Sequence, residues 1–137
     1  MKPRFLWIMV LAAVFIAGMT NAASTPPKGS AERREILAAL RQELKTWTKL
    51  DVIFVVKYLK VKDGWAWVTA FPESPDGKSK YEPVEALLHK KAGAWQVMEM
   101  RPGGAECEED PDCADDTRYF RKLKDRFPAV NAEIFPH

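Results

Sequence analysis

Histidine is scarce in this chain, and its shortage argues against catalysis. The 137 residues include two histidines, His89 and His137. No nucleophile elbow, HExxH pair or Ser/Lys signature accompanies them. Glu82 and Glu85 come nearest to a pair of catalytic acids, but glutamates beside an expected loop are usually solvated. We therefore expect no catalytic residue and no cofactor, and a small enzyme is the third of three functional interpretations.

Long apolar runs are absent except at the start of the chain. Lys2 and Arg4 precede an apolar run over residues 5–19, and small residues follow at 20–23. This order is typical of a cleaved secretory signal peptide. The run of 15 residues is shorter than the roughly 20 that a membrane span needs. We predict a signal peptide at residues 1–23, no membrane attachment after its cleavage, and a periplasmic or secreted location.

A surplus of charge is also missing. The signal peptide contains two of the 21 basic residues and none of the 19 acidic ones, so the mature chain is close to neutral. Binding to phosphates needs clustered Lys and Arg in excess, and we expect no nucleic-acid partner. The remaining chain of about 114 residues suits a single domain with one core.

Cysteine is limited to Cys107 and Cys113. In an oxidising compartment so close a pair is expected to form a disulfide, which stiffens its short loop more than it stabilises the whole fold. Residues 106–116 include seven carboxylates and no basic residue, so Ca²⁺ binding is one interpretation. The spacing does not fit an EF-hand, and oxidation removes the thiolates that zinc would need. We expect no metal and favour a solvated loop, neutralised by the basic helix that follows it.

Residues 24–29 include two prolines and are predicted to be a linker, with a single domain over 30–137. Ser30 suits the N-cap of a helix. The residues after it place an apolar side chain on one helical face at each turn: Ile36, Leu37, Leu40, Leu44 and Trp47. The pattern predicts an amphipathic helix with one buried stripe.

A β-hairpin is expected next, because residues 52–61 and 65–71 are rich in β-branched and aromatic side chains and flank Asp63-Gly64. A two-residue turn there places Lys60 opposite Trp67 and Leu59 opposite Val68, whereas a three-residue turn shifts this pairing by one. In the first case one face holds Phe54, Val56, Tyr58, Trp65, Trp67 and Phe71, and the other holds Val55, Leu59, Val61, Ala66, Val68 and Ala70. Both faces are apolar, so both need to be covered.

The rest of the chain contains a second hairpin and a short helix. A proline-rich loop at 72–83 leads to strands at 84–90 and 95–100, joined around Ala92-Gly93. Asp116 or Thr117 is expected to cap the last helix, which Pro128 ends. This order predicts an α+β fold: an N-terminal amphipathic helix packed on a curved antiparallel sheet of about four strands, with a short C-terminal helix.

The strand segments 54–61, 64–68, 86–90 and 93–97 resemble a family of small exported bacterial proteins of unknown function. The helix residues Ile36-Leu37 and Leu40-Arg41 and the closing Ile134-Phe135-Pro136 extend the resemblance over most of the mature chain. The resemblance implies a cystatin-like or nuclear-transport-factor-like arrangement, in which a curved sheet holds a helix and often leaves a pocket. It implies no catalytic residue, and the acidic residues 106–116 have no counterpart in it.

Two surfaces are candidates for binding. The first is aromatic, and a pocket for an apolar or ring-bearing ligand would be lined by Tyr58, Trp65, Trp67 and Phe71. Aromatic side chains on strands mostly belong to the core, so we favour the alternative that the C-terminal helix and tail cover them. The second is the disulfide-closed loop, which would dock on a partner through Glu108, Glu109, Asp110 and Asp112.

We interpret the chain as an exported, non-enzymatic domain that binds a small ligand or another exported protein. The alternative is an inhibitor or immunity-type protein that acts through the acidic loop 106–116, whose negative charge suits a cationic enzyme such as a lysozyme.

Overall fold

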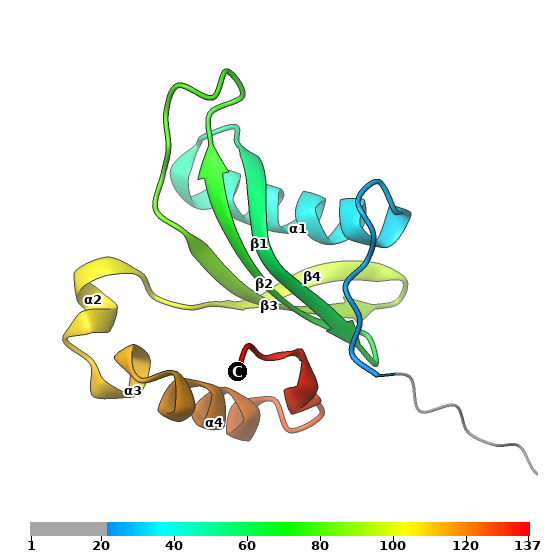
Figure 1. The fold of residues 1–137 in the computed structure, drawn as a ribbon, viewed down its shortest axis with the longest axis vertical. Helices are drawn as coiled ribbons and strands as arrows, with labels where there is room; N and C mark the ends of the chain where they lie inside the picture. The colour runs from blue at the N-terminus through cyan, green and yellow to red at the C-terminus, as the bar shows by residue number, and fades with distance from the viewer. Residues whose placement is uncertain (1–21) are drawn as a thin grey trace, which may run out of the picture.

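The computed structural model describes residues 22–137, so the charged and apolar parts of the expected signal peptide lie outside the described residues. The fold is α+β, with several helices around an open antiparallel sheet of four strands (Figure 1). In chain order the elements are α1 (Ala31–Thr48), β1 (Ile53–Lys62), β2 (Trp65–Glu73), β3 (Val84–Lys91), β4 (Ala94–Met100), α2 (Gly104–Glu108), α3 (Pro111–Ala114), α4 (Asp116–Arg126) and the 3₁₀ turn η1 (Ala132–Ile134). The strands pair in the order in which they occur in the chain.

Helix α1 starts and stops at recognisable residues. The Ser30 hydroxyl accepts a hydrogen bond from the backbone N–H of Arg33, and the helix ends at Lys49, whose φ of 60° is left-handed. Ile36 and Leu40 are fully buried against the sheet. The expected buried stripe does not extend to Trp47, which is 76% exposed and donates its indole N–H to Glu43. The last turn of α1 therefore contributes little to the core.

The two hairpin turns are both two residues long. Asp63 and Gly64 have φ values of 52° and 76°, and the turn at residues 92–93 repeats this left-handed pair. Such turns match the twist of the strands that they join. The predicted pairs are confirmed, because Leu59 faces Val68 and Lys60 faces Trp67.

A β-bulge between Val56 and Tyr58 corrects the predicted faces of β1. The bulge inserts one residue without a partner on β2, and this reverses the alternation of side chains along the strand. Phe54 and Val56 therefore pack with the core under α1, not on the face of Tyr58 and Trp67. Val55 pairs with Phe71 on the opposite face.

The sheet has a hydrophobic core on each face, as its two apolar faces require. Figure 1 shows α1 on one side of the sheet and α4 with the C-terminal tail on the other. The core under α1 includes the buried side chains of Ile36, Leu40, Leu59, Val61, Ala66, Val68, Ala70, Ala86, Leu88 and Trp95. The core under α4 and the tail includes those of Trp65, Trp67, Leu87, Tyr119, Leu123, Val130, Ile134 and Phe135.

The segment expected to be an acidic loop contains two short helices, α2 and α3. Asp110 caps α3 by accepting a hydrogen bond from the backbone N–H of Asp112 at 2.9 Å, and Pro111 occupies the first turn, where no N–H is needed. Asp115 caps α4 by accepting a hydrogen bond from the backbone N–H of Arg118. It precedes both of the predicted cap residues, Asp116 and Thr117. No helix in residues 22–137 is long and apolar enough to cross a membrane.

Residues 24–29, expected to be a linker, contact the fold. Ser24 forms two backbone hydrogen bonds with Val61 on the outer edge of β1, and the carbonyl of Pro26 accepts a bond from Arg33. Beside them, Lys62 pairs with Glu133 at 3.1 Å and lowers the pKa of that carboxyl, joining β1 to the C-terminal turn. This short N-terminal strap covers one end of β1.

Candidate functional site

The structure divides the aromatic residues that were expected to line a pocket. Trp65 and Trp67 are buried. Tyr58 is partly buried and donates its hydroxyl hydrogen to the carbonyl of Ile134 at 2.9 Å, while Phe71 remains exposed near the other end of β2. The four side chains therefore do not surround one pocket, and the two indoles belong to the core.

The C-terminal residues cover the two tryptophans directly. The ring of Trp67 lies 5.0 Å from that of Phe120 and 5.8 Å from that of Phe135, both in edge-to-face geometry. Trp65 stacks on His89 with 3.8 Å between ring centroids. Contacts of these types stabilise a packed aromatic core.

The acidic segment, residues 106–116, is closed by the predicted disulfide between Cys107 and Cys113. Cys113 is buried, whereas Glu108, Glu109 and Asp110 are exposed. Asp112 is partly exposed and pairs with Lys122 on α4, whose hydrogen bond lowers the pKa of the Asp112 carboxyl. The segment thus turns its cysteines toward the protein and several of its carboxylates toward solvent.

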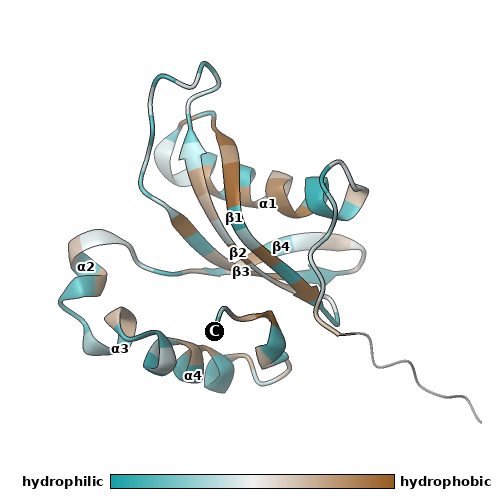
Figure 2. Ribbon diagram, viewed as in Figure 1, coloured by the Kyte–Doolittle hydropathy of each residue, from teal (hydrophilic) through white to brown (hydrophobic). Residues whose placement is uncertain are grey.

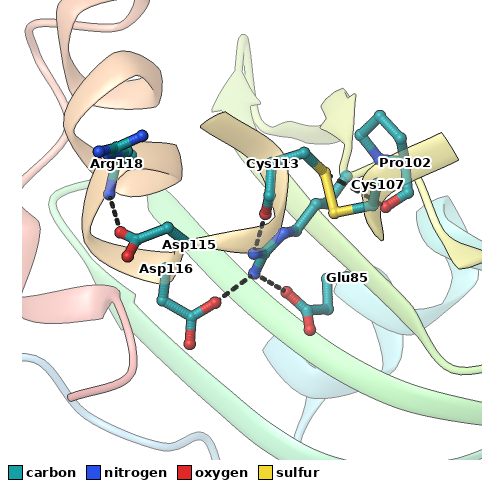
Figure 3. Close-up of polar contacts among 8 residues, drawn as sticks. Glu85, Pro102, Cys107, Cys113, Asp115, Asp116 and Arg118 are labelled. Atoms are coloured by element: carbon teal, nitrogen blue, oxygen red, sulfur yellow. Dashed lines mark hydrogen bonds and ion pairs between the residues drawn. A yellow bond between two sulfur atoms is a disulfide. The ribbon is translucent and has the colours of Figure 1, made fainter. Parts of the chain in front are cut away.

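Arg101 attaches this segment to the sheet (Figure 3). Its side chain is 10% exposed, and one guanidinium nitrogen lies 3.1 Å from a carboxylate oxygen of Glu85 and 2.8 Å from one of Asp116. The other terminal nitrogen donates to the backbone carbonyl of Cys113. The guanidinium also lies 4.4 Å from the ring centroid of Tyr119, within range of a cation–π contact.

These contacts outweigh the cost of burying the Arg101 charge. Burial acts to lower the pKa of Arg101, but the hydrogen bonds and negative charges of Asp116 and Glu85 raise it above its ordinary value. A planar guanidinium with five N–H donors can serve several acceptors at once, which a lysine ammonium does not match. Arg101 therefore joins β3, the acidic segment and the start of α4 at one point.

No role was assigned to Arg101 from the sequence alone. A local signal was present, because a single arginine stands between a strand and an acidic, disulfide-closed segment. The partners of Arg101 could not be read from that signal. Glu85 lies 16 positions away along the chain and Asp116 lies 15 positions away, and the fold alone brings them to one guanidinium.

Two grooves flank the acidic segment. One groove of about 420 Å³ lies between the end of β4, α3 and α4. Arg126 and Glu99 both line it and form an ion pair of 2.7 Å. Tyr119 lines the same groove, and burial raises the pKa of its hydroxyl. The other groove, of about 500 Å³, is lined partly by Arg101 and Cys107. Residues of the acidic segment therefore line both grooves.

Of the residues considered for catalysis, Glu82 and Glu85 both line the groove of about 500 Å³, whereas His89 does not. His89 stacks on Trp65, and burial, aided by the charge of Lys91, lowers its pKa. Glu85 is engaged by Arg101. Within residues 22–137 no group of three or more His, Cys, Asp or Glu side chains is placed to hold a metal ion.

Comparison of the chain with protein-family models, with curated proteins and with solved structures finds no significant match.

Proposed function

We propose that this chain is an exported, non-enzymatic binding domain that docks on another exported protein through the acidic segment. The observation that carries the proposal is the attachment of the segment at three points: the Cys107–Cys113 disulfide, the bond from Arg101 to the Cys113 carbonyl, and the Asp112–Lys122 pair. The partner is expected to present a basic surface.

The attachment matters because binding is opposed by the entropy lost when flexible groups become ordered. A segment that is already ordered loses less on docking. Glu106, Glu108 and Glu109 are exposed and form no ion pair within residues 22–137, so they remain available to cations of a partner. Complementary charge of this kind accelerates association and selects partners by sign.

A second candidate function is inhibition of a cationic exported enzyme, with lysozyme as the test case. The attachment of the acidic segment at three points favours this candidate, because a segment that is already ordered loses little entropy when it enters a substrate cleft. It is a special case of the first proposal, in which the docked enzyme also loses activity.

We also propose that this chain is related to small exported bacterial proteins of cystatin-like or nuclear-transport-factor-like arrangement. Its support is the chain order, in which one long helix precedes two hairpins of a single antiparallel sheet. The proposed periplasmic or secreted location has the support of the charged and apolar pattern of residues 1–23.

Surface plasmon resonance with lysozyme over the immobilised, disulfide-intact protein tests the docking proposal. Glu108→Lys with Glu109→Lys is expected to weaken binding about tenfold or more, because two attractive charges become repulsive. The matched control reverses the charge of two exposed glutamates of α1, by Glu32→Lys with Glu35→Lys. It is expected to leave the affinity for lysozyme within about twofold. Equal affinity of all three proteins would show that the acidic segment is not the docking surface.

An assay of lysozyme activity separates the two candidates. Inhibition by the native protein, and loss of inhibition with the Glu108→Lys, Glu109→Lys variant, supports an inhibitor. Binding without inhibition supports the docking domain alone.

A further inference from the structure

The outer edge of β1 is open over most of its length. β1 is the first strand of the sheet, and its outer edge is paired only at Val61, by Ser24, among the residues that the structure describes. The two residues exchange both of their backbone hydrogen bonds. In an antiparallel ladder the next such pair would join the residue two positions later in the strap, Pro26, to the residue two positions earlier in β1, Leu59. Because proline has no N–H to donate, the N-terminal strap cannot extend its pairing along β1.

The end of the β1–β2 hairpin away from the strap exposes apolar side chains. Ile53 is 44% exposed, Val55 is 40% exposed and Phe71, directly opposite Val55, is 37% exposed. They lie on the face of the sheet that the C-terminal segment covers elsewhere. Figure 2 shows this part of β1 in brown, away from α4 and the tail. A cluster of exposed apolar residues beside an unpaired strand edge is characteristic of a surface that binds another chain.

Positive charge surrounds this edge. A groove of about 430 Å³ runs between the start of α1 and residues 54–56 of β1, and its charged lining residues are Lys28, Arg33 and Arg34. Lys57 stands at the bulge with its ammonium 5.6 Å from the ring centroid of Phe71. None of these four cations forms an ion pair within residues 22–137. The surface therefore combines free backbone groups, apolar side chains and uncompensated positive charge.

We propose that the β1 edge, centred on residues 53–57, binds an extended segment of a partner protein in which apolar and acidic side chains alternate. The segment pairs with β1 as a fifth strand of the sheet. Its apolar side chains cover Val55 and Phe71 beside Lys57, and its carboxylates, which point to the opposite face of the sheet, meet Lys28 and Arg34. Backbone pairing supplies affinity in strand addition, and the alternating side chains supply selectivity.

The charge at this edge favours such a segment over a second copy of this chain. Antiparallel pairing of β1 with β1 would bring two lysine-bearing strands together, and like charges across strands are destabilising. The acidic segment of a second copy is no substitute, because α2 and α3 are helical and do not present an extended strand.

The test uses the disulfide-intact protein and a fluorescein-labelled peptide of eight residues that alternates valine and glutamate. Fluorescence anisotropy is expected to detect binding that weakens as salt rises. Lys28→Glu with Arg34→Glu is expected to weaken it about tenfold, since two attractive contacts become repulsive. The charge control is Lys78→Glu, an exposed lysine in the loop after β2, with no expected change in affinity.

Hydrogen exchange locates the peptide. Slower exchange of backbone amides in residues 53–60 on peptide binding supports strand addition, whereas protection confined to residues 106–116 overturns it. The inference is also overturned if the peptide fails to bind at millimolar concentration, if a peptide with lysine in place of glutamate binds equally well, or if the protein alone forms a dimer that buries β1. A far-UV circular dichroism spectrum unchanged by the substitutions shows that lost binding is not lost folding.

Discussion

Arg101 is the residue on which the position of the acidic segment depends most. Its guanidinium holds Glu85, Asp116 and the Cys113 carbonyl together and covers the ring of Tyr119. Several of these contacts join residues of different elements. A substitution at Arg101 therefore disturbs both the sheet and the helices. Replacement by another cation would keep the charge but not the set of directed bonds.

Arg101→Met is therefore expected to lower the free energy of unfolding by about 2 kcal/mol. The loss is smaller than for a fully buried pair, because Glu85 and Asp116 are partly solvated and can recover hydration. Denaturant unfolding measures the change. Arg121→Met, at an exposed position on α4, is the matched control and should change stability by less than about 0.5 kcal/mol. Equal effects of the two substitutions would contradict the role assigned to Arg101.

His89 gives the fold a pH dependence at the residue scale. Burial and the nearby Lys91 lower its pKa from the ordinary value of 6.5, so the unfolded chain binds a proton more readily than the folded chain does. The stabilising contribution of the neutral imidazole is complete above pH 6.5 and is lost as pH falls toward the lowered pKa. An NMR titration of the His89 ring should give a midpoint below 6.5. A midpoint at or above that value would contradict the burial argument.

At the scale of elements, the disulfide and Arg101 explain why helical structure forms in the acidic segment. Helices α2 and α3 contain five and four residues, too few to be stable alone in water. Side-chain capping by Asp110 contributes, but closure of the cysteine pair and the bond to the Cys113 carbonyl fix the backbone. None of the residues 106–116 belongs to either of the two hydrophobic cores of the domain.

Replacing both Cys107 and Cys113 by alanine is expected to cost about 2 kcal/mol, the value typical of closing so short a loop. Hydrogen exchange should accelerate more in residues 106–116 than in β2 and β3, where a loss of about 2 kcal/mol allows at most about a thirtyfold increase. Equal acceleration in the sheet and in residues 106–116 would contradict the local role of the disulfide.

The elements that sequence predicts well are those whose signals are local. Asp63-Gly64 and Ala92-Gly93 select two-residue turns by their own backbone preferences, so both hairpins and the pairing of Leu59 with Val68 follow from neighbouring residues. The bulge beside Lys57 could not be predicted in this way, because a β-branched strand with an extra residue looks continuous in sequence.

The candidate site was predictable only in part. The disulfide and the exposed carboxylates of residues 106–116 follow from composition. The structure buries Trp65 and Trp67 under the C-terminal helix and tail, which is the interpretation that the sequence analysis favoured for this aromatic face. The contacts of each indole with particular rings of the tail could not be derived from the strand pattern.

At the scale of the whole molecule, charge is distributed unevenly over residues 24–137, which are close to neutral in sum. Uncompensated cations gather around the start of α1 and β1, and uncompensated carboxylates gather on the acidic segment. Figure 1 shows that these two regions belong to different parts of the fold, one beside the N-terminal strap and one beyond the end of β4. The molecule can therefore present two surfaces of opposite sign to different partners.

The central claim is that the ordered acidic segment is the docking surface for a basic exported protein. The most direct measurement is amide hydrogen exchange of the disulfide-intact protein, alone and with saturating lysozyme. We predict slower exchange in residues 106–116 and no change in α1 or β1. Unchanged exchange in the acidic segment, or protection confined to β1, would contradict the claim.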